Sequence, residues 1–179
     1  MSIGVGDALG TFKSQGLIAL VLLVGFIVGY IIDVNVYTND SPVQPIAFSH
    51  RIHVTDNEIP CLHCHVYADR TPVAGVPSVS KCMVCHNAVV PDRPEIQKLA
   101  GYWERKEPIP WVKVHDVPDF VYFSHKRHVT SGLECQQCHG PIETMDQVTR
   151  ISNLRMPFCV DCHTLNEVEY GRDCWTCHK

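Results

Sequence analysis

One five-residue pattern occurs five times in this chain and contains all ten of its cysteines. In each copy two residues separate a pair of cysteines, and a histidine follows the second cysteine. In chain order the copies, called sites 1 to 5, are Cys61–His65, Cys82–His86, Cys135–His139, Cys159–His163 and Cys174–His178. Two thiols at this spacing can each form a thioether to one vinyl group of the same porphyrin, and the imidazole that follows can ligate its iron. The pattern therefore predicts five covalently attached c-type haems.

Other uses of paired cysteines fit this chain less well. Zinc sites use the same cysteine spacing, and thioredoxin-like redox sites need a βαβ context that the sequence lacks. A disulfide framework gives no reason for a histidine after every second cysteine. We therefore assign all cysteines to haem attachment: Cys61, Cys64, Cys82, Cys85, Cys135, Cys138, Cys159, Cys162, Cys174 and Cys177. The proximal iron ligands are then His65, His86, His139, His163 and His178.

Six of the eleven histidines lie outside these proximal positions, and five irons need five distal ligands if every haem is closed. We predict that the distal ligands are His50, His53, His115, His125 and His128. His63 lies between the cysteines of site 1, so its side chain can hardly reach the far face of the same haem. Met145 or Met156 could replace one histidine, because methionine also ligates haem iron. Iron with two axial ligands carries electrons without binding substrate, so no catalytic residue is expected.

A duplicated segment precedes sites 1 and 3. Phe48–Thr55 (FSHRIHVT) and Phe123–Thr130 (FSHKRHVT) agree at six of eight positions. Each copy is followed by one attachment site and later by another. The repeat predicts two duplicated two-haem modules, over 48–90 and 115–165, with a terminal fifth haem.

The fold class follows from chain length. The chain has 179 residues for five haems, too few to build an ordinary hydrophobic core around them. We expect the macrocycles to form the core of a small multihaem domain with little regular secondary structure, namely short helices and long loops. Apolar spacing also predicts a helix over 94–104. The net charge of −4 gives no support for a nucleic-acid partner.

Residues 17–32 contain no charged side chain. As a helix they would reach only about 24 Å, just short of a usual membrane span. We predict an N-terminal transmembrane anchor here, preceded by a cytoplasmic tail at 1–16 and followed by a linker at 33–47 and a pentahaem domain at 48–179. A cleaved signal peptide is disfavoured, because no small-x-small cleavage site follows. The predicted location is the cytoplasmic (inner) membrane, single-pass, with the haem domain on the periplasmic side.

The longer pattern resembles a known family. A predicted anchor, then FSHRIHV, CLHCH and CMVCHN, then PIPWVKVHDVPDFVYFSHKRHV and three further sites is similar to the pentahaem cytochrome c subunit of bacterial alternative complex III, a quinol:electron-acceptor oxidoreductase. The paired histidines also resemble those of class III multihaem cytochromes. The resemblance implies an electron-transfer subunit that relays electrons from quinol oxidation to a periplasmic-side acceptor. It also implies partners: an iron–sulfur subunit resembling molybdopterin oxidoreductases, polytopic quinol-binding membrane subunits, and a monohaem cytochrome c or another external acceptor.

A stand-alone membrane-anchored multihaem quinol dehydrogenase that feeds a periplasmic reductase is the alternative. Such proteins usually carry four haems, and the fifth site and the two FSHxxH copies favour the first interpretation.

Overall fold

The chain consists of two units in the computed structural model, which describes residues 5–37 and 40–178, with the side chains of the first helix described over 15–31. The first unit is Met1–Asn39 and the second is Asp40–Lys179. All five attachment sites belong to the second unit. The boundaries that we predicted within the chain remain predictions.

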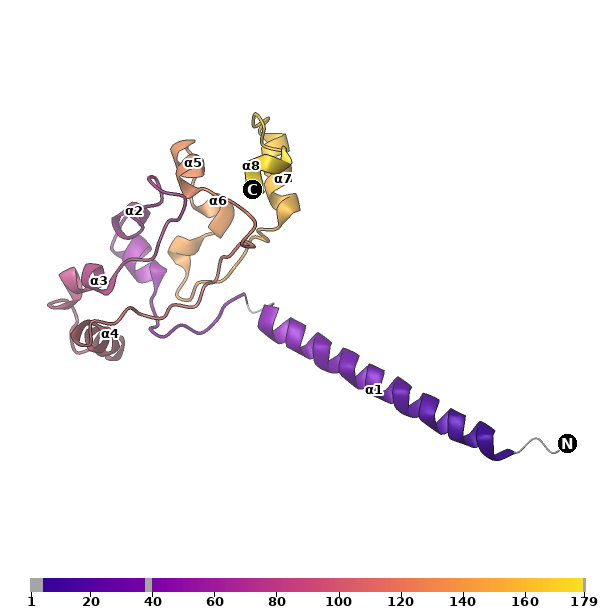
Figure 1. The fold of residues 1–179 in the computed structure, drawn as a ribbon. Helices are drawn as coiled ribbons and strands as arrows, with labels where there is room; N and C mark the ends of the chain where they lie inside the picture. The colour runs from indigo at the N-terminus through magenta and orange to yellow at the C-terminus, as the bar shows by residue number, and fades with distance from the viewer. Residues whose placement is uncertain (1–4, 38–39, 179) are drawn as a thin grey trace. The chain divides into compact units, whose positions relative to one another are not determined.

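The first unit is built around one helix, α1 (Val5–Tyr37, Figure 1). Its described apolar side chains are exposed on all faces, from Ile27 at 46% to Phe26 at 73%. Over the described residues, the structure contains no helix with the length and apolar character needed to cross a membrane. This finding corrects the predicted anchor at 17–32, and with it the predicted single-pass location in the cytoplasmic membrane. The physical reason is length, since the uncharged stretch is shorter than the about 20 residues that a span requires.

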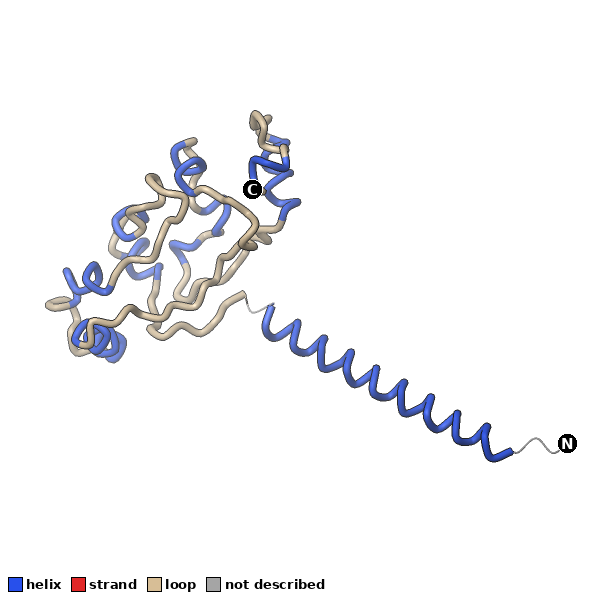
Figure 2. Tube along the Cα trace, viewed as in Figure 1, coloured by secondary structure: helices blue, strands red, loops and turns tan. Residues whose placement is uncertain are grey.

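The second unit contains short helices joined by long loops, and residues 40–178 include no β-strand (Figure 2). Its helices are a π-helical turn η1 (Ile52–Asp56), α2 (Cys61–Cys64), α3 (Val79–His86), α4 (Pro94–Glu104), α5 (His125–Thr130), α6 (Gln136–His139), a 3₁₀ turn η2 (Ile142–Thr144), α7 (Met156–Leu165) and α8 (Cys174–Cys177). The prediction of a small helical multihaem domain with short helices is confirmed for this unit.

Only a small apolar core lies between these elements. Ile46, Leu99 and Ile109 form a buried cluster, and Met83 of α3 packs against it. Leu99 comes from α4, which has the predicted bounds and begins with Pro94, a residue that suits the first turn of a helix. Ile109 comes from the proline-rich stretch after α4, so this stretch packs inside the domain. The cluster fixes α3, and hence site 2, onto α4.

The two modules also hold each other in place. Arg51, in the first FSHxxH copy, donates its backbone N–H to the Met145 carbonyl at 3.1 Å and pairs with the Asp146 carboxylate at 3.1 Å. In the opposite direction, the backbone N–H of Lys126 in α5 donates to the Thr71 carbonyl at 3.1 Å. Each histidine-bearing turn is thus anchored on a loop of the other module.

Candidate haem sites

Every pair of attachment cysteines lies on a helical turn. The pairs belong to α2, α3, α7 and α8, and the third pair spans the start of α6. Residues three apart in a helix share a face, so both thiols of each pair point to one side. All ten thiols are free. The geometry therefore fits two thioethers to one porphyrin at each site.

Four of the five proximal imidazoles are oriented by a backbone carbonyl. In site 1, Nδ1 of His65 lies 2.8 Å from the Gly75 oxygen, and in site 4, Nδ1 of His163 lies 2.7 Å from the Gly171 oxygen. The corresponding distance is 3.2 Å both from His86 to the Val89 oxygen and from His178 to the Phe120 oxygen. Because a carbonyl can only accept, Nδ1 carries the proton and Nε2 keeps its lone pair. A hydrogen bond from the other ring nitrogen to a carbonyl is what orients histidine ligands toward a metal.

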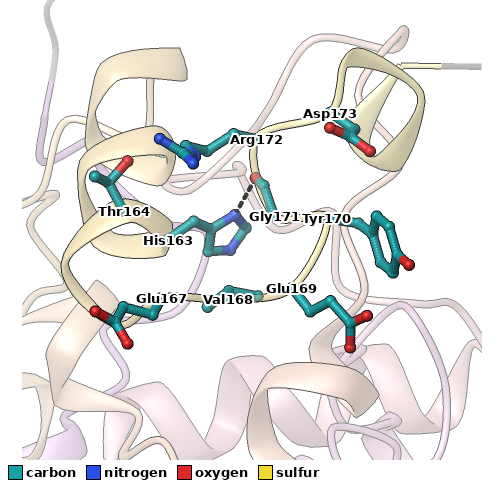
Figure 3. A pocket seen from close by; sticks show the side chains of 9 residues that line it. All are labelled: His163, Thr164, Glu167, Val168, Glu169, Tyr170, Gly171, Arg172 and Asp173. Carbon is teal, nitrogen blue, oxygen red and sulfur yellow. Dashed lines mark hydrogen bonds between the residues drawn. The ribbon is translucent and has the colours of Figure 1, made fainter.

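Gly171 allows the closest of these contacts (Figure 3). A methyl group at this position would lie 2.9 Å from Cβ of Val168 and 3.0 Å from Cβ of His163. Only glycine therefore lets the loop after α7 approach near enough for its carbonyl to reach His163. The same loop lines a cavity of about 470 Å³ that His163 borders. Sequence inspection did not identify Gly171, because no local motif marks the need for a close backbone approach.

The repeated FSHxxH segments have the same geometry. Phe48 stacks on His53 with ring centroids 4.4 Å apart, and Phe123 stacks on His128 at 4.5 Å. In each copy the phenylalanine also contacts the first histidine edge-on, with interplanar angles of 87° and 88°. The second histidine donates Nδ1–H to the carbonyl of the preceding serine, at 2.7 Å in the first copy and 2.8 Å in the second. The two copies of the sequence repeat therefore share one structure, in which Nε2 of the second histidine lies on the side of the ring away from the serine carbonyl.

Three distal candidates face proximal histidines at a separation that fits an iron. The ring centroids are 5.9 Å apart for His53 and His86, 6.3 Å for His125 and His139, and 6.1 Å for His128 and His163. An imidazole nitrogen lies about 2 Å from a bound metal and its ring centroid about 1 Å further, so two opposed ligands place their centroids about 6 Å apart. The residues present thus fit bis-histidine haem iron at sites 2, 3 and 4.

The position of His50 in the repeat also indicates which site it faces. In the second module the first histidine faces site 3 and the second faces site 4, and in the first module His53 faces site 2. The same order would place His50 at site 1, and its role as a distal ligand remains a prediction. Burial, with smaller contributions from nearby His65 and His53, lowers the pKa of His50 to about 4. Its buried Nδ1 has no hydrogen-bond partner among the described atoms. A neutral imidazole is the form that ligates metal.

His115 and His63 occupy different surroundings. The His115 ring lies edge-on to His139, with centroids only 4.4 Å apart and an angle of 84°. Burial lowers the pKa of His115, and the Arg150 charge adds to this effect. Burial likewise lowers the pKa of His139 to about 4, with further contributions from His115, His125 and His65. His63 is exposed on α2. The structure therefore brings His115 to site 3, while its predicted role as a distal ligand remains a prediction.

Neighbouring thiols identify which sites adjoin at one end of the domain. Burial raises the pKa of the Cys82 thiol, and the nearby Cys64 thiol raises it further, so site 2 adjoins site 1. Burial also raises the pKa of the Cys135 thiol, and Cys61 adds to this through both its charge and a side-chain hydrogen bond. Site 1 therefore adjoins site 3.

Thiols of neighbouring sites also raise each other's pKa towards the C-terminus. Burial raises the pKa of the Cys138 thiol, with contributions from Cys162 and Cys159, so site 3 adjoins site 4. Burial raises the pKa of the Cys159 thiol too, and the next contribution comes from Cys177 in site 5. The sites thus follow one another in space as 2, 1, 3, 4 and 5. In Figure 1, α3, α2 and α6 succeed one another, with α7 and α8 together at the far end.

This chain is similar to known proteins of two kinds. Residues 121–179 match the family described as cytochrome c7 and related cytochrome c. The chain is also 31% identical over 164 residues to the menaquinone reductase, multihaem cytochrome c subunit, of Nitratidesulfovibrio vulgaris, an alignment that covers 76% of this chain and 77% of the relative. The attachment sites and the facing histidines lie within a multihaem c-type cytochrome. More particularly, the chain belongs to the family of multihaem cytochrome c subunits that includes this menaquinone reductase subunit.

Proposed function

We propose that this chain is a five-haem electron relay within a quinone-linked oxidoreductase complex. The observation that carries the proposal is the row of five adjoining attachment sites, three of which have histidine pairs spaced for an iron. The family relationship supports the same function, because the relative is named as a cytochrome subunit of a reductase.

The residues of the chain have three tasks in this proposal. The ten cysteines fix the porphyrins, and the five proximal histidines ligate their irons. His50, His53, His125 and His128 supply distal ligands. Haem iron held in this way supplies reversible one-electron chemistry, with a potential set by its ligands and surroundings. The backbone carbonyls hold the imidazoles in the neutral tautomer that the metal needs.

Sites 2 and 5 are the two ends of the row, and their surroundings differ. Site 2 packs beside α4 through the apolar cluster at Leu99. Site 5 is on α8, where Trp175 is 79% exposed. We propose that a complex partner faces one end and an external redox protein the other. The partners that the family resemblance implies are an iron–sulfur subunit, quinone-binding subunits and a monohaem cytochrome c.

The direction of electron flow distinguishes two versions of this function. The resemblance to alternative complex III implies flow from quinol to an external acceptor. The name of the relative, a menaquinone reductase, describes flow towards the quinone. Both versions use the same relay.

Affinity purification of the tagged chain from native membranes tests the proposal. We expect co-purifying subunits, five haems on this chain, and anaerobic haem reduction by a menaquinol analogue or haem oxidation by the corresponding quinone. Whichever reaction runs gives the direction. The His63→Ala variant is the matched control and should behave as wild type, because His63 is exposed and takes no part in the described ring contacts with proximal histidines. Direct exchange between the isolated chain and quinol would instead support the stand-alone dehydrogenase.

A further inference from the structure

Site 5 is the one attachment site to which we have assigned no distal histidine. All eleven histidines lie within residues 40–178, which the structure describes. Five are proximal, and His50, His53, His125 and His128 serve sites 1 to 4. The remaining two are His63, exposed on the turn that carries site 1, and His115. The question is whether His115 can serve site 5.

The position of His115 argues against that role. Its ring contacts His139 of site 3 at 4.4 Å, which is too short for an iron between them and leaves His125 as the ligand opposite His139. Its buried Nε2 has no hydrogen-bond partner among the described atoms, and neither has the buried Nδ1 of His139. His139 is also the one proximal histidine whose Nδ1 no described carbonyl orients. The His115 ring therefore packs edge-on against the His139 ring without forming a hydrogen bond to its Nδ1.

The surroundings of site 5 are open. His178 donates Nδ1–H to the Phe120 carbonyl, and the Tyr122 N–H donates to the Cys177 carbonyl at 2.8 Å, so residues 120–122 hold the proximal side. The Phe120 ring lies 5.7 Å from the His178 ring. An open hollow beside α8 is lined by Tyr170 and Trp175 among others, and both are largely exposed.

No described contact brings Met83, Met145 or Met156 to site 5. Met145 lies beside the first module, where its carbonyl accepts from the Arg51 N–H and its sulfur from the Thr149 N–H at 3.5 Å. Met83 packs in the apolar cluster of α4. Met156 begins α7 with 65% of its surface exposed.

We propose that the haem at site 5 has a sixth coordination position that no histidine of this chain fills, and that this position binds a small exogenous ligand. The ligand class is a diatomic donor, CO on the ferrous iron or cyanide on the ferric iron. Ligand access to haem iron depends on what occupies its distal side. This inference rests on the proposed haem content.

Carbon monoxide titration of the full-length, dithionite-reduced holoprotein tests the inference, with the haem count measured on the same sample by pyridine haemochrome. We expect five haems and one CO per chain. Five haems with no CO bound, or with more than one, overturn the inference while the proposed relay stands. Fewer than five haems would count against the proposed haem content itself.

Three variants locate the ligand. His128→Ala opens site 4 and should bind two CO per chain, which provides the positive control. His115→Ala should bind one, as wild type does; a second CO bound by this variant would make His115 a distal ligand and contradict its assignment. Cys174→Ser with Cys177→Ser should carry four haems and bind no CO, whereas retained binding would place the open iron elsewhere. If this double variant does not mature, the wild-type and His115→Ala stoichiometries still decide the result.

Discussion

Replacing Gly171 with alanine tests how the backbone tunes a single haem. The added methyl group would lie 2.9 Å from Cβ of Val168 and 3.0 Å from Cβ of His163, whereas ordinary contact begins at 3.4 Å. Neither neighbouring atom is the flexible end of a side chain, so the loop after α7 must move outward by about half an ångström. The hydrogen bond from His163 Nδ1 to the Gly171 carbonyl, now 2.7 Å, then reaches the long end of the range for N–H···O bonds, about 3.2 Å.

The consequence is a change in reduction potential at site 4. A short bond from Nδ1–H makes the imidazole a stronger donor, which favours ferric iron, so a weaker bond raises the potential. Loss of the group that hydrogen-bonds a metal-ligating histidine typically changes metal affinity about 10- to 100-fold. A tenfold change in the ferric form alone corresponds to about 59 mV for one electron. Because the bond is lengthened and not removed, we expect an increase of tens of millivolts, with about 60 mV as the upper limit.

Potentiometric titration of the holoprotein, followed at the haem α-band, measures this shift. One of the five components should move upward and the other four should stay in place. Gly101→Ala is the matched control, because its methyl group would meet only the end of the Arg105 side chain, at 3.0 Å. An unchanged titration, or a downward shift, would show that the Gly171 carbonyl does not tune His163.

Further predictions concern haem content, stability and pH. Pyridine haemochrome analysis should give five haems per chain, all retained on acid–acetone extraction; stoichiometric zinc, or fewer than four haems, would refute the assignment. Leu99→Ala should lower the free energy of unfolding by about 2–5 kcal/mol, because a leucine that is only 4% exposed leaves a cavity. In the same denaturant titration Val43→Ala, at a side chain 83% exposed, should change little. His50 and His139 have folded pKa values of about 4, below the usual 6.5, so the folded chain binds fewer protons than the unfolded chain between these values. Stability should therefore fall as the pH is lowered through 6.5 to 4, and a rise over this window, measured by chemical denaturation, would contradict the assignment of neutral histidines.

Local sequence patterns predicted the elements of the domain well. The attachment motifs lie on helical turns, and the helix over 94–104 has the predicted bounds. The FSHxxH repeat reappears as two matching ring clusters. These features depend on residues within one turn of each other, so spacing alone encodes them.

Features that depend on distant contacts were not predictable in the same way. The order of sites as 2, 1, 3, 4 and 5 involves residues far apart in the sequence, as does the contact of Arg51 with Asp146, and no local pattern reports it. His115 lies in a bend that follows the segment containing the buried Ile109. Sequence suggested that it was free to approach an iron, whereas the structure packs it against His139. The predicted anchor was wrong because the absence of charge over 17–32 does not make up for the short length of that stretch.

A cryo-EM map of the holoprotein in its complex tests the central claim most directly. We expect an iron between His53 and His86, between His125 and His139, and between His128 and His163, with the five porphyrins following the order 2, 1, 3, 4 and 5. An iron ligated by a different histidine pair at these sites, a cysteine pair without a porphyrin, or a break in this order would contradict it.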